Sequence, residues 1–108
     1  MIINNFLEVE PKEEKNYLGG DRSITLAKVF ENTAFDTDYL ILESGSSVGL
    51  HLAERDKIYI VLSGEGIIEC DGDRNEVCAG DCVTVPKGKS SGIFNTSVFD
   101  LRILWIAK

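Results

Sequence analysis

Apolar residues in this chain recur in short runs and at alternate positions, and both patterns are typical of β-strands. The clearest run, residues 58–62, has five consecutive strand-forming residues and ends at a glycine-rich turn. A strand that is apolar on both faces has to be covered on both faces. Alternation along 99–106 places Phe99, Leu101, Ile103 and Trp105 on one face. Other strand-like segments are 2–9, 24–30, 39–42, 48–53, 66–70, 76–78 and 82–85, and a further one is 91–95.

Turn signals separate these segments, and no stretch has the period of an amphipathic helix. The Asp71-Gly72 pair between two strand-like segments is a strong hairpin signal. Pro11 and the charged residues 12–15 predict a solvated connector after the first strand. Roughly nine or ten short strands with close turns and no helices predict an all-β sandwich or barrel.

Length and charge narrow the classes of partner. The 108 residues suit a single domain, and 44% apolar with 27% charged residues is ordinary for a globular protein. A net charge of −7 without a basic stripe argues against nucleic acid as a partner. No signal-peptide pattern is present, and no apolar run approaches the roughly 20 residues that span a bilayer, so no membrane association is expected.

The three cysteines, Cys70, Cys78 and Cys82, are an odd number without a paired framework. Reduced thiols and a cytoplasmic location are therefore expected. The spacing of Cys78 and Cys82 is not that of structural zinc sites, and Cys82 is expected to be a small apolar side chain of the core.

Framework residues between 45 and 64 resemble the first motif of the cupin superfamily, Gly-x5-His-x-His-x3,4-Glu-x6-Gly. Gly45, His51 and Gly64 match at the correct spacing. Ala53 stands where the motif has its second histidine, and Lys57 where it has the glutamate.

A second stretch resembles the other cupin motif, Gly-x5-Pro-x-Gly-x2-His-x3-Asn. Gly80, Pro86, Gly88 and Asn95 match, and Ser91 replaces the histidine. The resemblance implies a cupin-type double-stranded β-helix, a jelly-roll barrel, formed by a single domain over 1–108. Residues 1–18 would be an N-terminal strand and connector able to take part in a dimer.

Most cupins hold a metal ion, but three of the four ligand positions implied by the resemblance carry other residues. A divalent site needs three or four converging donors, and His51 beside an alanine, an ammonium and a hydroxyl does not supply them. We therefore expect no metal and no other cofactor. A metal-dependent enzyme with non-standard ligands remains a further hypothesis.

Strand alternation puts Lys57 and Tyr59 on the same face, and the resemblance points His51, Lys57, Tyr59 and Ser91 into one barrel mouth. Such a polar cluster in an apolar cup suits a small polar or anionic molecule, with Lys57 meeting negative charge. Structural roles are open for each of them: His51 as a residue inherited with the fold, Tyr59 as a core aromatic and Ser91 as a pocket wall.

An isomerase or epimerase is the alternative, because some metal-free cupins catalyse such reactions. By analogy, His51 would be the base, Lys57 would stabilise the enolate and Tyr59 would return the proton. A base usually has a partner that fixes its tautomer, and the sequence shows no obvious one. Whether the protein is an enzyme is therefore left open.

The outward face of the central strand, with Ile58, Ile60 and Leu62, is also apolar. A solvent-facing sheet would alternate with polar residues. The cover is expected to be the N-terminal strand or a second subunit, and we predict an isologous homodimer.

Overall fold

The computed structural model describes residues 1–108 and contains ten strands and one short 3-10 turn, so the all-β prediction is confirmed. The elements are β1 (Lys12–Lys15), η1 (Tyr17–Gly19), β2 (Ser23–Phe30), β3 (Asp36–Leu42), β4 (Ser47–Leu52), β5 (Lys57–Ser63), β6 (Glu65–Cys70), β7 (Asp73–Cys78), β8 (Cys82–Val85), β9 (Ser90–Phe94) and β10 (Leu101–Ala107). None of the helical structure has the length and hydropathy that crossing a membrane requires.

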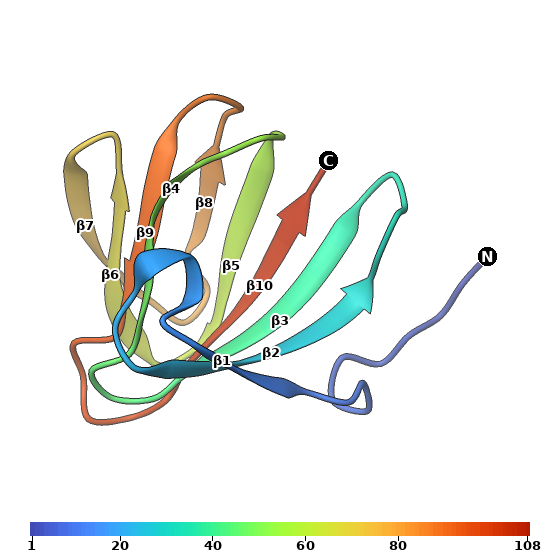
Figure 1. Ribbon diagram of the computed structural model, residues 1–108, viewed down its shortest axis with the longest axis horizontal. Coiled ribbons are helices and arrows are strands. Elements are labelled where there is room, and N and C mark those ends of the chain that lie inside the picture. Colours follow the sequence, from blue (N-terminus) through green and yellow to red (C-terminus); the bar gives the residue numbers. More distant parts are fainter.

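The strands form two antiparallel sheets that face each other as the walls of a flattened barrel (Figure 1). The larger sheet has the order β1-β2-β3-β10-β5-β8, and the smaller one has the order β4-β9-β6-β7. Strand β10 therefore lies between β3 and β5, which it pairs on either side. Sheets of six and four strands are a typical way to bury one apolar face of each.

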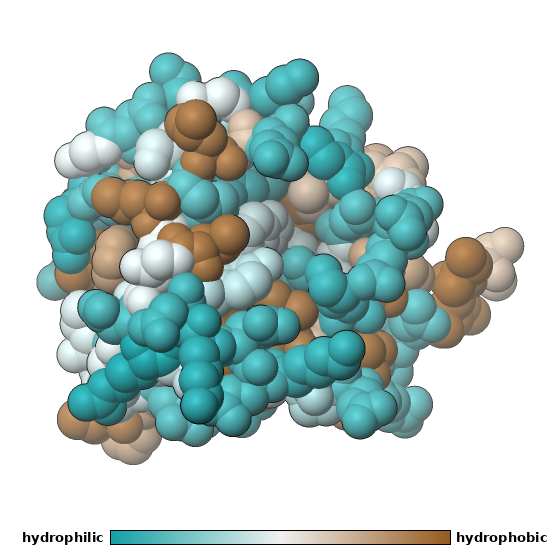
Figure 2. Space-filling model, in the orientation of Figure 1, coloured by the Kyte–Doolittle hydropathy of each residue, from teal (hydrophilic) through white to brown (hydrophobic).

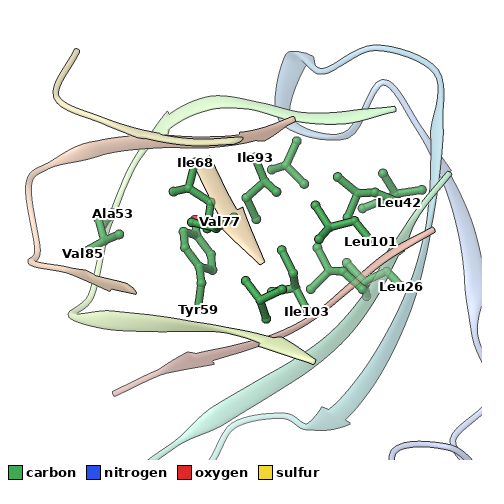
Figure 3. Packing of buried hydrophobic residues seen from close by; sticks show 14 residues of the cluster. Leu26, Leu42, Ala53, Tyr59, Ile68, Val77, Val85, Ile93, Leu101 and Ile103 are labelled. Carbon is green, nitrogen blue, oxygen red and sulfur yellow. The ribbon is translucent and has the colours of Figure 1, made fainter. Parts of the chain in front are cut away.

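Apolar side chains from both sheets fill the space between them. Figure 3 shows Leu26, Leu42 and Leu101 at one end of this core, and Tyr59, Ala53 and Val85 toward the other. Tyr59, Leu42 and Leu101 are completely inaccessible to solvent. The inward side of the central strand, predicted from alternation, is confirmed because Lys57, Tyr59 and Val61 are all buried. The predicted face of the last strand is wrong at Phe99, which precedes β10 and is 73% exposed.

The N-terminal region departs from the prediction, because residues 2–5 have no regular secondary structure and residues 6–9 form a turn and a bend rather than a strand. The backbone N–H of Glu8 donates to the carbonyl of Asn5, and the N–H of Leu7 donates to the Asn5 side chain. An asparagine that captures nearby backbone donors in this way competes with strand pairing. The first strand is instead β1, in the segment predicted as a connector, and it pairs with β2 at the edge of the sheet. Charged side chains are compatible with an edge strand because they can reach solvent.

The N-terminal segment covers one end of the larger sheet's outer face. Phe6 packs on Tyr39 with ring centroids 4.7 Å apart, and Asn4 donates a hydrogen bond to the carbonyl of Val29. Leu62 belongs to the apolar cluster packed there. Ile58, at the other end of β5, is 39% exposed and has no such cover. The first residues then leave the body of the molecule, where they form the brown group at the edge of Figure 2.

The framework positions of the two sequence motifs have mechanical roles. Gly64 has φ of +86°, and a Cβ there would lie 2.3 Å from the carbonyl oxygen of Asp100, so only glycine fits. Asn95 is buried, and its amide group donates to the carbonyls of Leu42 and Phe99 at 2.8 Å each. The side chain therefore ties β9 to β3 and to the loop before β10.

The hairpin predicted at Asp71-Gly72 is confirmed. Cys70 pairs with Asp73 across it, and both turn residues have positive φ, as a type I′ turn requires. The prediction for Cys82 is wrong, because its side chain is exposed. Strand β8 lies at the edge of the larger sheet, where the Cys82 side chain stays accessible to solvent.

Candidate functional site

A cavity of about 620 Å³ opens at one end of the barrel. Its polar lining residues are His51 and Lys57 on the strands, and Glu54 and Arg55 in the loop between β4 and β5. The remaining wall is apolar and is formed by Leu18, Leu52, Ala53, Trp105 and Ala107. A concave apolar site with few polar groups is the usual form of a small-molecule pocket.

Strands of both sheets bring the site residues together. His51 lies on β4 directly opposite Ser91 on β9, while Tyr59 on β5 lies opposite Trp105 on β10. Side chains of directly opposed residues project to the same side of a sheet. The four residues predicted from the sequence, His51, Lys57, Tyr59 and Ser91, therefore occupy one region between the sheets.

His51 and Lys57 form a direct hydrogen bond. The Lys57 Nζ lies 2.7 Å from His51 Nε2, and the other ring nitrogen, Nδ1, lies 2.8 Å from the carbonyl oxygen of Gly49. A carbonyl can only accept, so Nδ1 carries the proton, and Nε2 accepts a hydrogen bond from Lys57. Burial and the neighbouring ammonium lower the pKa of His51, which favours this neutral tautomer.

The partner that fixes the His51 tautomer is a backbone carbonyl. The sequence shows no obvious partner of this kind, because any residue at position 49 presents a carbonyl and the residue type carries no signal. The signal for the other missed residue, Trp105, was present, since alternation placed it on the same face as the core residue Ile103.

The Lys57 side chain is only 4% exposed and takes part in no ion pair of the protein. Its nitrogen lies 4.3 Å from the centre of the Trp105 ring and 5.0 Å from that of Tyr59. Burial lowers the pKa of Lys57 from 10.5 to about 8. At neutral pH the amine is thus still mostly an ammonium, held by an imidazole and two aromatic faces.

Tyr59 and Ser91 lie deeper than the cavity wall. Both are completely buried, and their hydroxyl oxygens are 2.9 Å apart. Burial raises the pKa of the Tyr59 phenol, and its hydrogen bond with Ser91 only partly offsets this. The pair satisfies two hydroxyls within the core, and its role in ligand binding stays a prediction.

The donor set does not fit the divalent metal that cupin motifs usually hold. No three His, Cys, Asp or Glu side chains converge anywhere in the protein. At the position where the sequence motif has its metal ligands, the lone pair of His51 Nε2 faces the ammonium of Lys57 rather than an open space. Cys70 is half-buried beside the core, and Cys78 and Cys82 are exposed, so thiolates do not complete a site.

Contacts between loops fix the rim of the cavity. Arg55 forms an ion pair of 2.6 Å with Asp36 and also donates to the carbonyl of Lys108. The turn η1 crosses over β4 (Figure 1) and brings Leu18 to the cavity. This crossing is so close that a Cβ on Gly49 would lie 2.1 Å from the carbonyl oxygen of Leu18. The carbonyl of the same Gly49 accepts the hydrogen bond from His51, so this one residue contacts both the turn at the rim and the imidazole.

Comparison with known proteins gives consistent matches. A family model described as "Cupin domain" matches residues 38–107. An oxalate-binding protein of Thermotoga maritima is 33% identical over 103 residues, which cover 90% of this chain and 85% of that protein. The crystal structure of a predicted oxalate decarboxylase from Thermotoga maritima has a TM-score of 0.90 at 32% identity, covering 97% of this chain and 96% of that one.

A more distant likeness concerns the fold alone. KdgF from Halomonas sp. superposes with a TM-score of 0.80 at 18% identity, and the match covers 100% of this chain and 94% of that one.

Proposed function

This chain belongs to the cupin family, and from that premise we propose that it binds a small organic anion in the barrel cavity without a metal ion. The family assignment confirms the resemblance seen in the sequence and the jelly-roll barrel that it implied. Binding of a small molecule is the part of this proposal that the relatives support. The anionic charge and the absence of a metal are argued from this chain's own residues.

One observation carries the proposal: the cavity wall contains an ammonium that forms no ion pair, and Glu54, which also lines the cavity, does not pair with Lys57. Lys57 is held by the neutral His51 and by the rings of Trp105 and Tyr59. These groups accept its hydrogen bond and attract its charge, but none of them carries a formal negative charge at neutral pH. A carboxylate entering the cavity would meet a cation already stripped of most of its water, where an ion pair is stronger than at the surface.

Oxalate is the first candidate ligand, because one relative is named an oxalate-binding protein. Its carboxylates are small enough for a cavity of about 620 Å³. The apolar wall leaves room for other short carboxylates, so the proposal is for the class, with oxalate as the first test.

Titration calorimetry with oxalate, in buffer containing a chelator, tests the proposal. We expect binding by the wild-type protein and a loss of about 2 kcal/mol or more, roughly thirtyfold in Kd, in Lys57→Met. Lys87→Met removes an exposed lysine and serves as the matched control. Equal affinity in wild-type protein and Lys57→Met, or binding that requires added divalent metal, would overturn the proposal.

A metal-independent isomerase or epimerase is the second candidate, and the hydrogen bond from His51 to Gly49 favours it. That bond leaves an unprotonated Nε2 on the cavity side, as a general base needs. The base would become free only when Lys57 releases its hydrogen bond to that nitrogen. Exchange of a substrate C–H proton with solvent deuterium, lost in His51→Ala, would favour this reading over simple binding.

We further propose that the single domain 1–108 forms a homodimer through the outer face of β5 and β10. Ile58 is 39% exposed there, and a groove beside it is lined by Phe35, Pro86 and Ile106. A second copy of the chain would cover these side chains symmetrically. Light scattering on size-exclusion fractions should show a dimer that Ile58→Glu converts to a monomer.

The unpaired cysteines fit a reducing compartment such as the cytoplasm.

A further inference from the structure

We propose that Lys57 is also a nucleophile, whose amine forms an imine with a small aldehyde or ketone that enters the cavity. This activity goes beyond the binding of an anion and does not depend on it. It uses the neutral form of the amine, whereas the binding of a carboxylate uses the ammonium. No other lysine of the chain has a comparable environment, because all six of the others are exposed.

The first requirement of such a lysine is an apolar setting, which makes the uncharged amine accessible near neutral pH. Lys57 is 4% exposed and faces a wall formed mainly by Leu18, Leu52, Ala53 and Trp105. The position also gives the amine access to a ligand, since Lys57 lines the cavity itself.

The second requirement is a neighbouring base that can accept and return protons. The nitrogen of Lys57 lies 2.7 Å from Nε2 of His51. The carbonyl of Gly49 holds the proton on the other ring nitrogen at 2.8 Å, so Nε2 presents its lone pair to the lysine. The lysine, the imidazole and the carbonyl that orients it form an ordered set of three groups.

The reaction balances without an oxidant or a reductant. His51 accepts one proton from the ammonium, and the amine lone pair attacks the carbonyl carbon to form a C–N bond. The carbonyl oxygen takes up that proton from His51, and a carbinolamine results. Loss of the second nitrogen-bound proton and of the hydroxyl releases water and leaves a protonated imine. The faces of Trp105 and Tyr59, which now contact the ammonium, would then lie against the iminium cation.

Reductive trapping with pyruvate tests the inference on the purified protein. Pyruvate is a small ketone that exposed lysines trap poorly, and borohydride converts an imine with it into a stable secondary amine. Peptide mapping by mass spectrometry should find one reduced adduct per chain, on Lys57, with Lys87 unmodified. His51→Gln retains a hydrogen-bond acceptor but no base, and is expected to slow the labelling roughly a hundredfold. No adduct on Lys57, or equal labelling of exposed lysines, would overturn the inference.

Two ligands and one variant separate this inference from the proposed function. Oxalate has no aldehyde or ketone carbon, so calorimetry with oxalate reports the anion site alone. Lys57→Arg keeps a cation but lacks a nucleophilic amine, and it should abolish trapping while oxalate still binds. Wild-type protein that binds oxalate but traps no pyruvate would refute only the imine. Wild-type protein that traps pyruvate on Lys57 but does not bind oxalate would refute only the anion site.

Discussion

Replacing Lys57 with methionine is expected to stabilise the protein at pH 7 although it removes the proposed binding group. Burial lowers the pKa of Lys57 from 10.5 to about 8, and such a shift means that the charged form costs about 3 kcal/mol relative to the neutral amine. The contact with the Trp105 ring acts only on the charged form, so it belongs to that net cost. The substitution also removes the hydrogen bond to His51, which contributes about 1 kcal/mol. The net expectation is a gain of about 2 kcal/mol in the free energy of unfolding at pH 7.

The sign of this difference should reverse with pH. Between pH 8 and 10.5, the unfolded chain binds a proton at Lys57 that the folded protein has released, so the stability of the wild-type protein rises with pH across that window. Above it, only the lost hydrogen bond matters, and the variant should be about 1 kcal/mol less stable than wild type.

Urea unfolding near both ends of this window measures the reversal. The matched control is Lys87→Met, an exposed position where a change within about 0.5 kcal/mol is expected at either pH. A variant already less stable than wild type at pH 7, or a difference that stays constant with pH, would refute the reasoning. Either result would mean that the ammonium is not the costly group in this cavity.

Three further predictions follow from the site and its frame. Affinity for oxalate should fall as pH rises through about 8, because Lys57 loses its charge there, and calorimetry at several pH values would detect the fall. The other titratable or charged groups near Lys57 are His51, Tyr59, Cys70, Glu54 and Arg55. Asn95→Ala should lower the free energy of unfolding in urea by about 3 kcal/mol, because it leaves the buried carbonyl of Leu42 without its side-chain donor and removes the hydrogen bond to Phe99. The exposed Asn75→Ala should change it little. Gly49→Ala should lower the free energy of unfolding by about 3 kcal/mol, because the added Cβ would clash with the backbone of Leu18. Gly72→Ala should lower it by only about 1 kcal/mol, because that Cβ meets open space and the cost is that of the positive φ alone.

The framework of the fold was predictable because it depends on residues that few others can replace. Gly64 needs positive φ and has a carbonyl where a Cβ would be, and Asn95 needs an amide that bridges two backbone segments. Such requirements leave a fixed spacing in the sequence. The region before β1 followed no such rule, since the turn at Asn5 depends on one side chain competing with strand pairing.

The sequence predicted which residues form the polar cluster, but not how deeply each of them is buried. Strand alternation and the motif spacing brought His51, Lys57, Tyr59 and Ser91 together, and the structure places them in one region between the sheets. Alternation gives the face on which a side chain lies and not its distance from solvent. For that reason the sequence did not predict that Tyr59 and Ser91 are buried beneath the cavity. It also did not predict the contact of Lys57 with the Trp105 ring.

The place of β10 in the larger sheet has a consequence during protein synthesis. Strands β3 and β5 are translated long before residues 101–107, yet each has one of its two neighbours only in that later segment, the other neighbours being β2 and β8. Until it leaves the ribosome, both have an open edge, and Trp105 is not there to complete the binding cavity. The barrel is therefore expected to close late, after a delay in which chaperones or other nascent chains can reach those edges.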